Sequence, residues 1–347
     1  MMKKSMTGYS VLLLCLLFSG AGCGAREEAE EFPKSGILQD EEIAANSEKY
    51  IVVGLSQVGS ESDWRITSTK SFQSTFTQEN GYYLLYEDGQ QKQENQLKAV
   101  RNFILQEVDY IVLDPIVETG WDGVLQEAKD AEIPVILTDR SIETTDENLY
   151  TCWVGSDFRA EGERAGEWLE SYLENQGREQ DEIQIVTLQG TPGSTAQLGR
   201  TEGFDRVLEN HDNWTMLDRQ SGDFTQAKAE EVMEQFLTTY DNIDVLICEN
   251  DNMAFGAVEA IHKAGKTCGP GGEIIIISFD GMRAGIEAII RGEINVIFEC
   301  NPLLGPEVEK IIQKLEQGES VEKIQYVEET YYDTSMDLEN ILENRAY

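Results

Sequence analysis

The chain has 347 residues, of which 40% are hydrophobic, so it is long enough for one large domain or two ordinary ones with a substantial core. It contains 27 Lys and Arg residues against 65 Asp and Glu residues, a formal net charge of −38. That charge argues against binding along a nucleic-acid phosphate backbone and against docking on anionic lipid through a basic patch. We therefore expect no nucleic-acid partner.

The amino terminus has the features of an export signal. A pair of lysines precedes the apolar run Val11–Phe18, which is too short to span a bilayer, and small residues lead from there to Cys23. A Gly-Cys pair in this position resembles a bacterial lipoprotein cleavage site, although Gly20 stands where that motif usually has Leu. We predict a lipoprotein signal peptide over residues 1–22 and lipid attachment to Cys23, with an ordinary cleaved signal as the alternative.

The segment that follows is acidic and lacks apolar periodicity. Residues 23–48 therefore fit a solvated tether between a membrane anchor and a folded body that begins near residue 49.

The cysteines of the body predict no metal centre. Their spacings match no CxxC or zinc pattern, and the sequence has only two histidines. We expect no cofactor and interpret these cysteines as small buried residues; a disulfide is possible outside the cytoplasm, but the sequence selects no pair among Cys152, Cys248, Cys268 and Cys300.

Short apolar runs in the body alternate with longer segments of helical period. The helical segments are 93–107, 121–131, 160–175, 227–240 and 253–264, and the strand-like runs are 50–58, 82–87, 110–115, 134–139, 183–189, 245–249, 274–279 and 294–299. This alternation predicts an α/β fold with parallel sheets covered on both faces. A further strand-like run at 151–157 precedes a second series of strands and helices, so we predict two similar lobes.

Polar residues follow the carboxyl ends of these runs. They are Asp139 and Arg140, Gln189, Asn250 and Asp251, Asp280, and Glu299. Each one alone is typical of a helix cap or a turn, but ligands of open α/β sheets bind at this edge, and the repetition predicts a site there.

The sequence gives little support to an enzyme. It lacks a G-x-G-x-x-G motif after a strand, a G-x-S-x-G elbow and an H-E-x-x-H motif, and AIHKAGKT at 260–267 has Ala where a phosphate-binding loop needs its first Gly. A pair of catalytic carboxylates is not excluded by composition, yet no spacing singles one out. We predict a binding protein.

The polar residue types suit a sugar. Carboxylates, amides and the guanidinium fork pair with adjacent hydroxyls, and a Trp face suits the C–H face of a sugar ring. Trp64 is surrounded by polar neighbours in SQVGSESDWR, residues 56–65, so we favour a site wall over a core position for it.

Several stretches make the chain resemble the periplasmic-type sugar-binding proteins of the ribose and galactose class, and most closely those that bind galactofuranose. They include GLSQVGSESDWR (54–65), DGQQKQENQLKAVRNF (88–103), ETGW (118–121), EAKDAEIPVILTDRSI (127–142), SGDFTQAK (221–228) and ENDNMAFGA (249–257). The resemblance extends from about residue 50 to the carboxyl terminus.

The resemblance implies a fold of two α/β lobes joined by three crossings that close on a sugar. The crossings would lie near 151–154, 299–301 and 328–331. The first lobe would comprise 49–152 and 300–329, and the second 153–299 and 330–347.

The resemblance also implies the residues that contact the sugar. From the first lobe these are Ser62, Trp64, Arg65, Asp139 and Arg140, with Glu61 and Asp63 beside them; from the second they are Arg200, Phe224, Asn250, Asp280 and Glu299, with Thr191, Asp223 and Gln189 as weaker candidates. Asp63 replaces the Gly that is usual in this loop, so we expect it to influence which sugar is preferred.

The function implied is that of a lipid-anchored extracytoplasmic receptor, which would deliver a monosaccharide to an ABC permease with its cytoplasmic ATPase. The alternative is a sensor that presents its sugar-bound state to a membrane histidine kinase or chemoreceptor. A transcriptional repressor of this fold would need a DNA-binding helix-turn-helix and a cytoplasmic location, and the export signal and charge argue against it.

Overall fold

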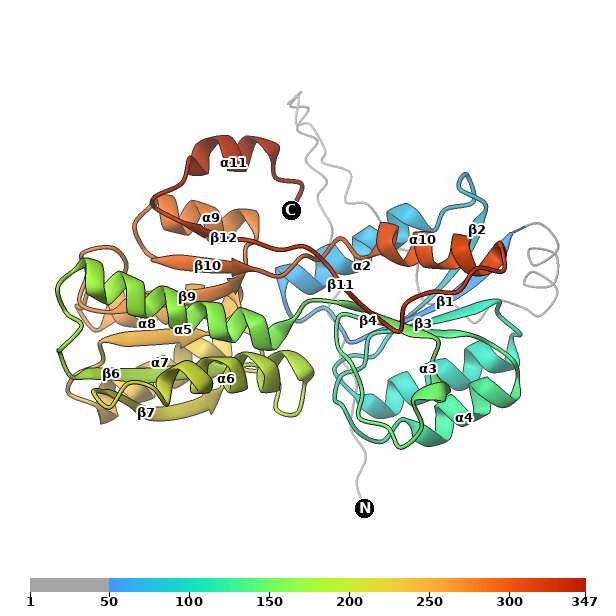
Figure 1. Ribbon diagram of the computed structural model, residues 1–347, viewed down its shortest axis with the longest axis horizontal. Coiled ribbons are helices and arrows are strands. Elements are labelled where there is room, and N and C mark those ends of the chain that lie inside the picture. Colours follow the sequence, from blue (N-terminus) through green and yellow to red (C-terminus); the bar gives the residue numbers. More distant parts are fainter. Residues whose placement is uncertain (1–49) are drawn as a thin grey trace, which may run out of the picture. The chain divides into compact units, whose positions relative to one another are not determined.

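Two six-stranded sheets with helices on both faces form the frame of residues 50–347, the part of the chain that the computed structural model describes (Figure 1). The predicted α/β class is therefore confirmed. The signal peptide, the tether and Cys23 lie outside the described residues. Within residues 50–347 no helix has both the length and the apolar character that crossing a bilayer requires.

The first sheet is parallel throughout and has the strand order β11-β5-β4-β3-β1-β2. Its strands are β1 (Ile51–Gln57), β2 (Tyr82–Asp88), β3 (Tyr110–Leu113), β4 (Val135–Thr138), β5 (Cys152–Gly155) and β11 (Ile324–Tyr326). Successive residues face opposite sides of a strand, so Val52 packs into one core cluster and Val53 into another. This explains why the central strands are apolar at nearly every position.

Helices cover both faces of this sheet. One core contains side chains from α3 (Gln93–Leu105) and α4 (Asp122–Asp130), and the other contains side chains from α2 (Asp63–Thr75) and α10 (Gly305–Glu316). A short 3₁₀ helix, η1 (Glu147–Leu149), precedes β5. The last helix of this group in the sequence, α10, is distant from α2 along the chain but packs beside it.

The second sheet repeats the arrangement with the order β12-β10-β9-β8-β6-β7, and only β12 is antiparallel. Its strands are β6 (Ile183–Gln189), β7 (Trp214–Ser221), β8 (Val245–Cys248), β9 (Ile275–Asp280), β10 (Val296–Glu299) and β12 (Tyr331–Asp333). On one face lie α5 (Phe158–Asn175) and α6 (Thr195–Leu208). The other face is covered by α7 (Gln226–Thr239), α8 (Asp251–Lys263), α9 (Arg283–Ile290) and α11 (Leu338–Asn344).

The chain passes three times between the sheets: after β5, after β10 and between β11 and β12. The first crossing was predicted at 151–154 and the lobe boundary at 152, which is wrong because β5 pairs with β4 through Val154 and with β11 through Gly155. The crossing therefore begins at Ser156. The apolar residues of Cys152–Gly155 complete the first sheet instead of leaving it.

Glu329 ties the three crossings together. Its Oε1 accepts a hydrogen bond from the Ser156 hydroxyl at 2.5 Å and another from the backbone N–H of Asn301 at 2.7 Å. Ser156 follows β5, Asn301 follows β10, and Glu329 itself precedes β12. One carboxyl group thus links all three connections.

Candidate functional site

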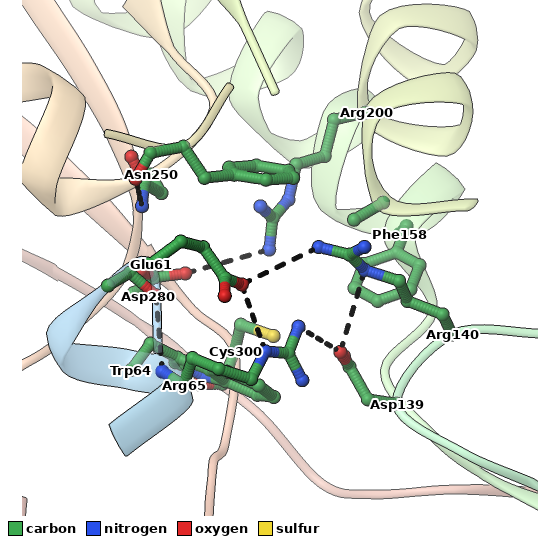
Figure 2. A pocket seen from close by; sticks show the side chains of 13 residues that line it. Glu61, Trp64, Arg65, Asp139, Arg140, Phe158, Arg200, Asn250, Asp280 and Cys300 are labelled. Atoms are coloured by element: carbon green, nitrogen blue, oxygen red, sulfur yellow. Dashed lines mark hydrogen bonds and ion pairs between the residues drawn. The ribbon is translucent and has the colours of Figure 1, made fainter. Parts of the chain in front are cut away.

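A pocket lies where residues from both lobes converge, and Figure 2 shows its lining side chains. Its cavity volume is only about 30 Å³, far below the range of about 300–1,000 Å³ that is typical of small-molecule sites, so the two walls lie close together. The lining residues are Glu61, Ser62, Trp64, Arg65, Asp139, Arg140, Phe158, Ala196, Arg200, Phe224, Asn250, Asp280 and Cys300. The lining combines charged, polar and aromatic side chains.

The loop from β1 to α2 supplies one end of the first lobe's wall. Ser62 is the N-cap of α2, and its hydroxyl accepts a hydrogen bond from the backbone N–H of Arg65 at 3.1 Å. This cap sets the start of the helix, so Trp64 and Arg65 fall in its first turn. Both side chains are at least 95% buried.

Arg65 is held by three buried carboxylates. It donates to Glu61 Oε1 at 3.1 Å and to Asp139 Oδ2 at 2.9 Å, and it also donates to Asp114. Burial opposes its charge, but the nearby charges of Asp114, Asp139 and Glu61 raise the pKa of Arg65 above its ordinary value. Arg65 is therefore a fixed cation that orients the acidic side chains of this wall.

Arg140 extends from the same wall with donor capacity to spare. It donates to the carbonyl of Ile116 at 3.0 Å and lies 3.9 Å from Asp139, but its Nε–H has no hydrogen-bond partner among the described residues. Burial lowers the pKa of Arg140, and the charge of Arg65 lowers it further. A ligand oxygen at this point would satisfy a buried donor.

The second lobe's wall is built around Arg200 on α6. Arg200 donates from Nε to Glu161 Oε2 at 2.7 Å and also donates to the carbonyl of Glu249. Its guanidinium lies 3.9 Å from Asp280, and burial raises the pKa of Asp280 well above its ordinary value, with the charge of Asp251 adding to the effect. Asp280 thus faces the pocket with only a loose ionic partner.

Asn250 joins the start of α8 to this wall. Its Oδ1 caps the helix by accepting from the backbone N–H of Met253 at 2.9 Å, and its Nδ2 donates to the carbonyl of Phe224 at 3.2 Å. The residues on either side are also engaged, since Glu249 accepts from Gly190 and Asp251 accepts from Met282. Burial raises the pKa of both carboxyls to about 7.

Aromatic rings complete the pocket. Trp64 is fixed by a hydrogen bond of 2.7 Å from its ring N–H to the carbonyl of Cys300. Phe224 lies against Gly190, where any Cβ would come within 1.9 Å of the ring, so this close approach requires glycine. With Phe158, these rings offer apolar surface beside the charged groups.

Three lining residues have left-handed backbone conformations: Asp139 (φ 58°), Phe224 (φ 60°) and Asp280 (φ 106°). Residues other than glycine rarely adopt this region, and such strain is common where side chains are held for function. Asp139 and Asp280 occupy comparable positions in the two lobes, at the end of β4 and of β9. Each turn directs a carboxylate into the pocket.

Within the described residues, several buried polar atoms of the lining have no partner. They are Glu61 Oε2, Arg140 Nε and Asp280 Oδ2. Two acceptors and one donor in a small pocket match the donor and acceptor capacity of hydroxyl groups. The site therefore suits a ligand that is rich in hydroxyls.

Ten of the predicted site residues line this pocket, and five do not. Thr191 lies in the turn before α6, where its carbonyl accepts from Ser194, and Asp223 accepts from the Ser221 hydroxyl and pairs with Lys228. The weaker candidate Gln189 donates to Thr201. The side chains of Asp223 and Gln189 are thus engaged within the second lobe.

Asp63 and Glu299 were also expected at the sugar, and the structure places both elsewhere. Asp63 is exposed and pairs with Asn252. Glu299 instead holds the carboxyl-terminal segment, accepting from Tyr332 at 2.8 Å, Arg345 at 2.7 Å and Tyr347 at 2.7 Å. Glu299 is the last residue of β10, and it lies beside β12 because β10 pairs with that strand.

Sequence reasoning missed some residues of the site. Phe158, Ala196 and Cys300 line the pocket, and Asp114 lies directly behind it as a partner of Arg65. Asp114 follows the end of β3, so the strand-end signal that marked Asp139 also applied to it. The others carry no comparable signal, since Phe, Ala and Cys are typical core residues.

The four cysteines of the described region are free and buried. Cys300 also belongs to a group with Glu161 and Glu329, whose ligand atoms lie within 4.8 Å of one another. Arg200 already donates to Glu161, and Ser156 donates to Glu329. A bound cation would face the Arg200 guanidinium, so this group does not support a metal site.

The chain is similar to known proteins over most of its length. A family model described as a periplasmic binding protein domain matches residues 53–319. The chain is 41% identical to the galactofuranose-binding protein YtfQ of Escherichia coli strain K12 over 286 residues, covering 81% of this chain and 87% of that protein.

Two solved structures are similar in both sequence and fold. A Mycobacterium smegmatis protein in complex with β-D-fucofuranose has a TM-score of 0.80 at 40% identity, covering 85% of this chain and 94% of that one. The periplasmic binding protein component of the arabinose ABC transporter from Shewanella sp. ANA-3, bound to α- and β-L-arabinofuranose, has a TM-score of 0.79 at 39% identity, covering 85% and 95%.

Proposed function

The chain belongs to the periplasmic binding protein family, and from this premise we propose that it captures a monosaccharide in its furanose ring form between the two lobes. It is a sugar-binding protein of the ABC transporter class and not an enzyme, as predicted. Galactofuranose and closely related hexo- and pentofuranoses are the ligands that we propose.

The charge balance of the pocket carries this proposal. Three arginines, Arg65, Arg140 and Arg200, face three lining carboxylates, Glu61, Asp139 and Asp280. Guanidinium and carboxyl groups are thus matched in number, and two further carboxyl groups, those of Asp114 and Glu161, lie behind the two walls. A phosphorylated or carboxylated sugar would meet repulsion, whereas a neutral sugar can pair with both kinds of side chain.

Support for the furanose form comes from the relatives. The Escherichia coli relative is a galactofuranose-binding protein, and the two solved structures hold fucofuranose and arabinofuranose. Each is about 40% identical to this chain over most of its length.

Ring-locked sugars test the proposal directly. Free galactose interconverts between ring forms, whereas 1,4-anhydrogalactitol is fixed as a furanose and 1,5-anhydrogalactitol as a pyranose. We expect the furanose-locked analogue to raise the unfolding midpoint, because a ligand at 100 times its Kd stabilises the native state by about 2.7 kcal/mol. The pyranose-locked analogue should give no comparable shift. Equal shifts, or a larger shift with the pyranose, would contradict the proposal.

We also propose that Cys23 carries a lipid and that the receptor delivers its sugar to a membrane permease. The lipoprotein-like cleavage site supports the anchor. Cells that express Cys23→Ser should release the protein from the membrane fraction and lose labelled palmitate from it. Unchanged membrane association of that variant would contradict the anchor.

Delivery to the permease is tested by uptake. Deleting the receptor should abolish import of the labelled sugar, and restoring it should recover import. If import continues while a sugar-dependent transcriptional response disappears, the receptor serves the sensory alternative.

A further inference from the structure

A reciprocal pair of hydrogen bonds joins the two lobes outside the pocket. The backbone N–H of Asp63 donates to Asn252 Oδ1 at 3.1 Å, and Asn252 Nδ2 donates to Asp63 Oδ2 at 3.2 Å. Asp63 is the first residue of α2, and Asn252 is the second residue of α8. The pair therefore links the amino-terminal ends of two helices that belong to different sheets.

The pair stands at the border of the pocket without lining it. Asp63 precedes Trp64, and Asn252 follows Asn250 by two residues. Figure 2 shows Trp64 and Asn250 on one side of the pocket and Arg140 and Asp139 on the other. The Asp63–Asn252 pair thus lies on the Trp64 side of the pocket. The two lining residues on that side come from the same helix ends, Trp64 from the start of α2 and Asn250 from the start of α8.

Helix electrostatics favour this contact. The first N–H groups of a helix have no partner within it, and the N–H of Asp63 is one of these groups in α2. Asn252 satisfies that donor across the lobes. The ends of α2 and α8 both carry partial positive charge, and the Asp63 carboxylate between them offsets their mutual repulsion as the lobes meet.

We propose that Asp63 and Asn252 form a latch that slows the release of sugar by stabilising the closed arrangement of the lobes. This inference rests on the proposed function of the pocket. Neither residue lines the pocket, so the latch acts on how long the lobes stay closed and not on which sugar they hold. It replaces the expectation that Asp63 selects the sugar.

Other lobe-to-lobe hydrogen bonds lie beside Arg140. The N–H of Ser141 donates to Thr195 Oγ1 at 3.2 Å, and the N–H of Glu118 donates to the carbonyl of Gly193 at 3.1 Å. Gly193 lies in the loop before α6, and Thr195 is the first residue of that helix. These bonds depend mainly on backbone groups, whereas the latch depends on two side chains and can be removed by substitution.

The test is a double-mutant cycle on the dissociation rate. Sugar release from the full chain is followed by rapid filtration after mixing protein loaded with radiolabelled galactose with an excess of unlabelled galactose, for the parent, Asp63→Ala, Asn252→Ala and the double variant. Each single variant should release sugar about two- to ten-fold faster, the range expected for one or two hydrogen bonds. The double variant should be no faster than the more affected single variant.

Gln126 and Asp130 give a matched control. They form an exposed amide-to-carboxylate hydrogen bond of 2.7 Å within α4, away from the pocket lining. Gln126→Ala should leave the release rate unchanged. The ratio of affinities for galactofuranose and arabinofuranose should also stay unchanged in both latch variants, because neither residue lines the pocket.

The outcomes separate the latch from the pocket function. If the parent binds furanoses and the latch variants release them at the parental rate, the latch is overturned while the proposed function stands. Fully independent effects of the two substitutions, or a changed sugar preference, would also overturn it. If the parent binds no sugar at all, the proposed function fails and the latch fails with it.

Discussion

The two lobes have the same strand order but different pocket walls. In the first lobe, Arg65 pairs with three buried carboxylates, and these four side chains form a connected network without a ligand. In the second lobe, Arg200 has one close carboxylate, Glu161, while Asp280 lies 3.9 Å away. The first wall is therefore held together by its own ion pairs, and the second leaves more hydrogen-bonding capacity for a ligand.

This difference shows how a repeated scaffold supports two chemical roles. The carboxyl ends of parallel strands provide the same positions in each lobe, and the residues placed there decide whether the wall is self-paired or open. Asp139 and Asp280 illustrate it, since both follow a strand with a left-handed backbone, yet only Asp139 makes a close ion pair with an arginine. We therefore expect substitutions in the first wall to affect folding more than those in the second.

The largest effect is expected from removing the central cation of the first wall. Arg65→Met would leave three buried carboxylates without their shared partner and should lower the free energy of unfolding by about 3–5 kcal/mol. Arg200→Met should cost less, because only Glu161 loses a close ion pair. Urea unfolding compares the two variants.

An exposed ion pair provides the control for this comparison. Arg101 pairs with Glu127 while both side chains are nearly half exposed, so Arg101→Met should leave the free energy of unfolding nearly unchanged. Equal losses in Arg65→Met and Arg200→Met would contradict the distinction between the walls.

The second wall should matter more for ligand binding. Asn250→Ala removes a side chain that lines the pocket and positions Phe224, and we expect sugar affinity to fall by at least about tenfold, the equivalent of 1.4 kcal/mol. The lost helix cap should cost about 1 kcal/mol of stability, which thermal unfolding measures separately. Calorimetry with galactofuranose gives the affinity, and Asn344→Ala, at an exposed amide near the end of α11, serves as the control. If Asn250→Ala binds the sugar as tightly as the parent does, Asn250 does not contribute to the site.

The free energy of unfolding should depend on pH through Glu329, the residue that links the three crossings. Burial and the negative charge of Glu161 raise the pKa of Glu329 to about 8 from an ordinary value of 4.5. Between about pH 4.5 and 8 the folded state therefore holds a proton that the unfolded state releases, and the free energy of unfolding falls as the pH rises through this window.

Glu329→Gln, which resembles the protonated acid, should reduce that fall by up to about 1.4 kcal/mol per pH unit. Urea titrations at pH 5, 6.5 and 8 compare the variant with the parent. The same slope in both proteins would show that Glu329 does not take up the proton.

The smallest effect on sugar affinity is expected at Glu299. Burial favours its neutral form, but hydrogen bonds from Tyr347, Arg345 and Tyr332 lower the pKa of Glu299 below its ordinary value, so the carboxylate stays charged. Glu299→Gln should loosen the carboxyl-terminal segment while sugar affinity stays within about twofold of the parent, less than one hydrogen bond contributes. Limited proteolysis from the carboxyl terminus and calorimetry test the two halves of this expectation. A large loss of sugar affinity in Glu299→Gln would show that Glu299 contributes to sugar binding.

Much of the fold could be predicted from apolar runs. All nine predicted strand-like runs overlap a strand of the structure. The edge strand β7 was missed because only Trp214 of its residues is buried, so its sequence WTMLDRQS lacks the apolar signal of a central strand. Likewise, α6 contains two glycines that pack closely against α5 instead of a clear apolar stripe.

For this protein, the sequence by itself determined the α/β class, the doubled series of strands and the polar strand ends that form most of the pocket, because burial periodicity and strand-end chemistry are local. Only the tertiary structure decided which strand-end residues meet. Glu299 turns to the carboxyl-terminal segment, Asp63 pairs with Asn252, and Asp114 joins Arg65. Each of these contacts joins residues at least 48 positions apart in the chain. They form only because strand pairing and the contact between the lobes bring distant segments together, which the local sequence does not predict.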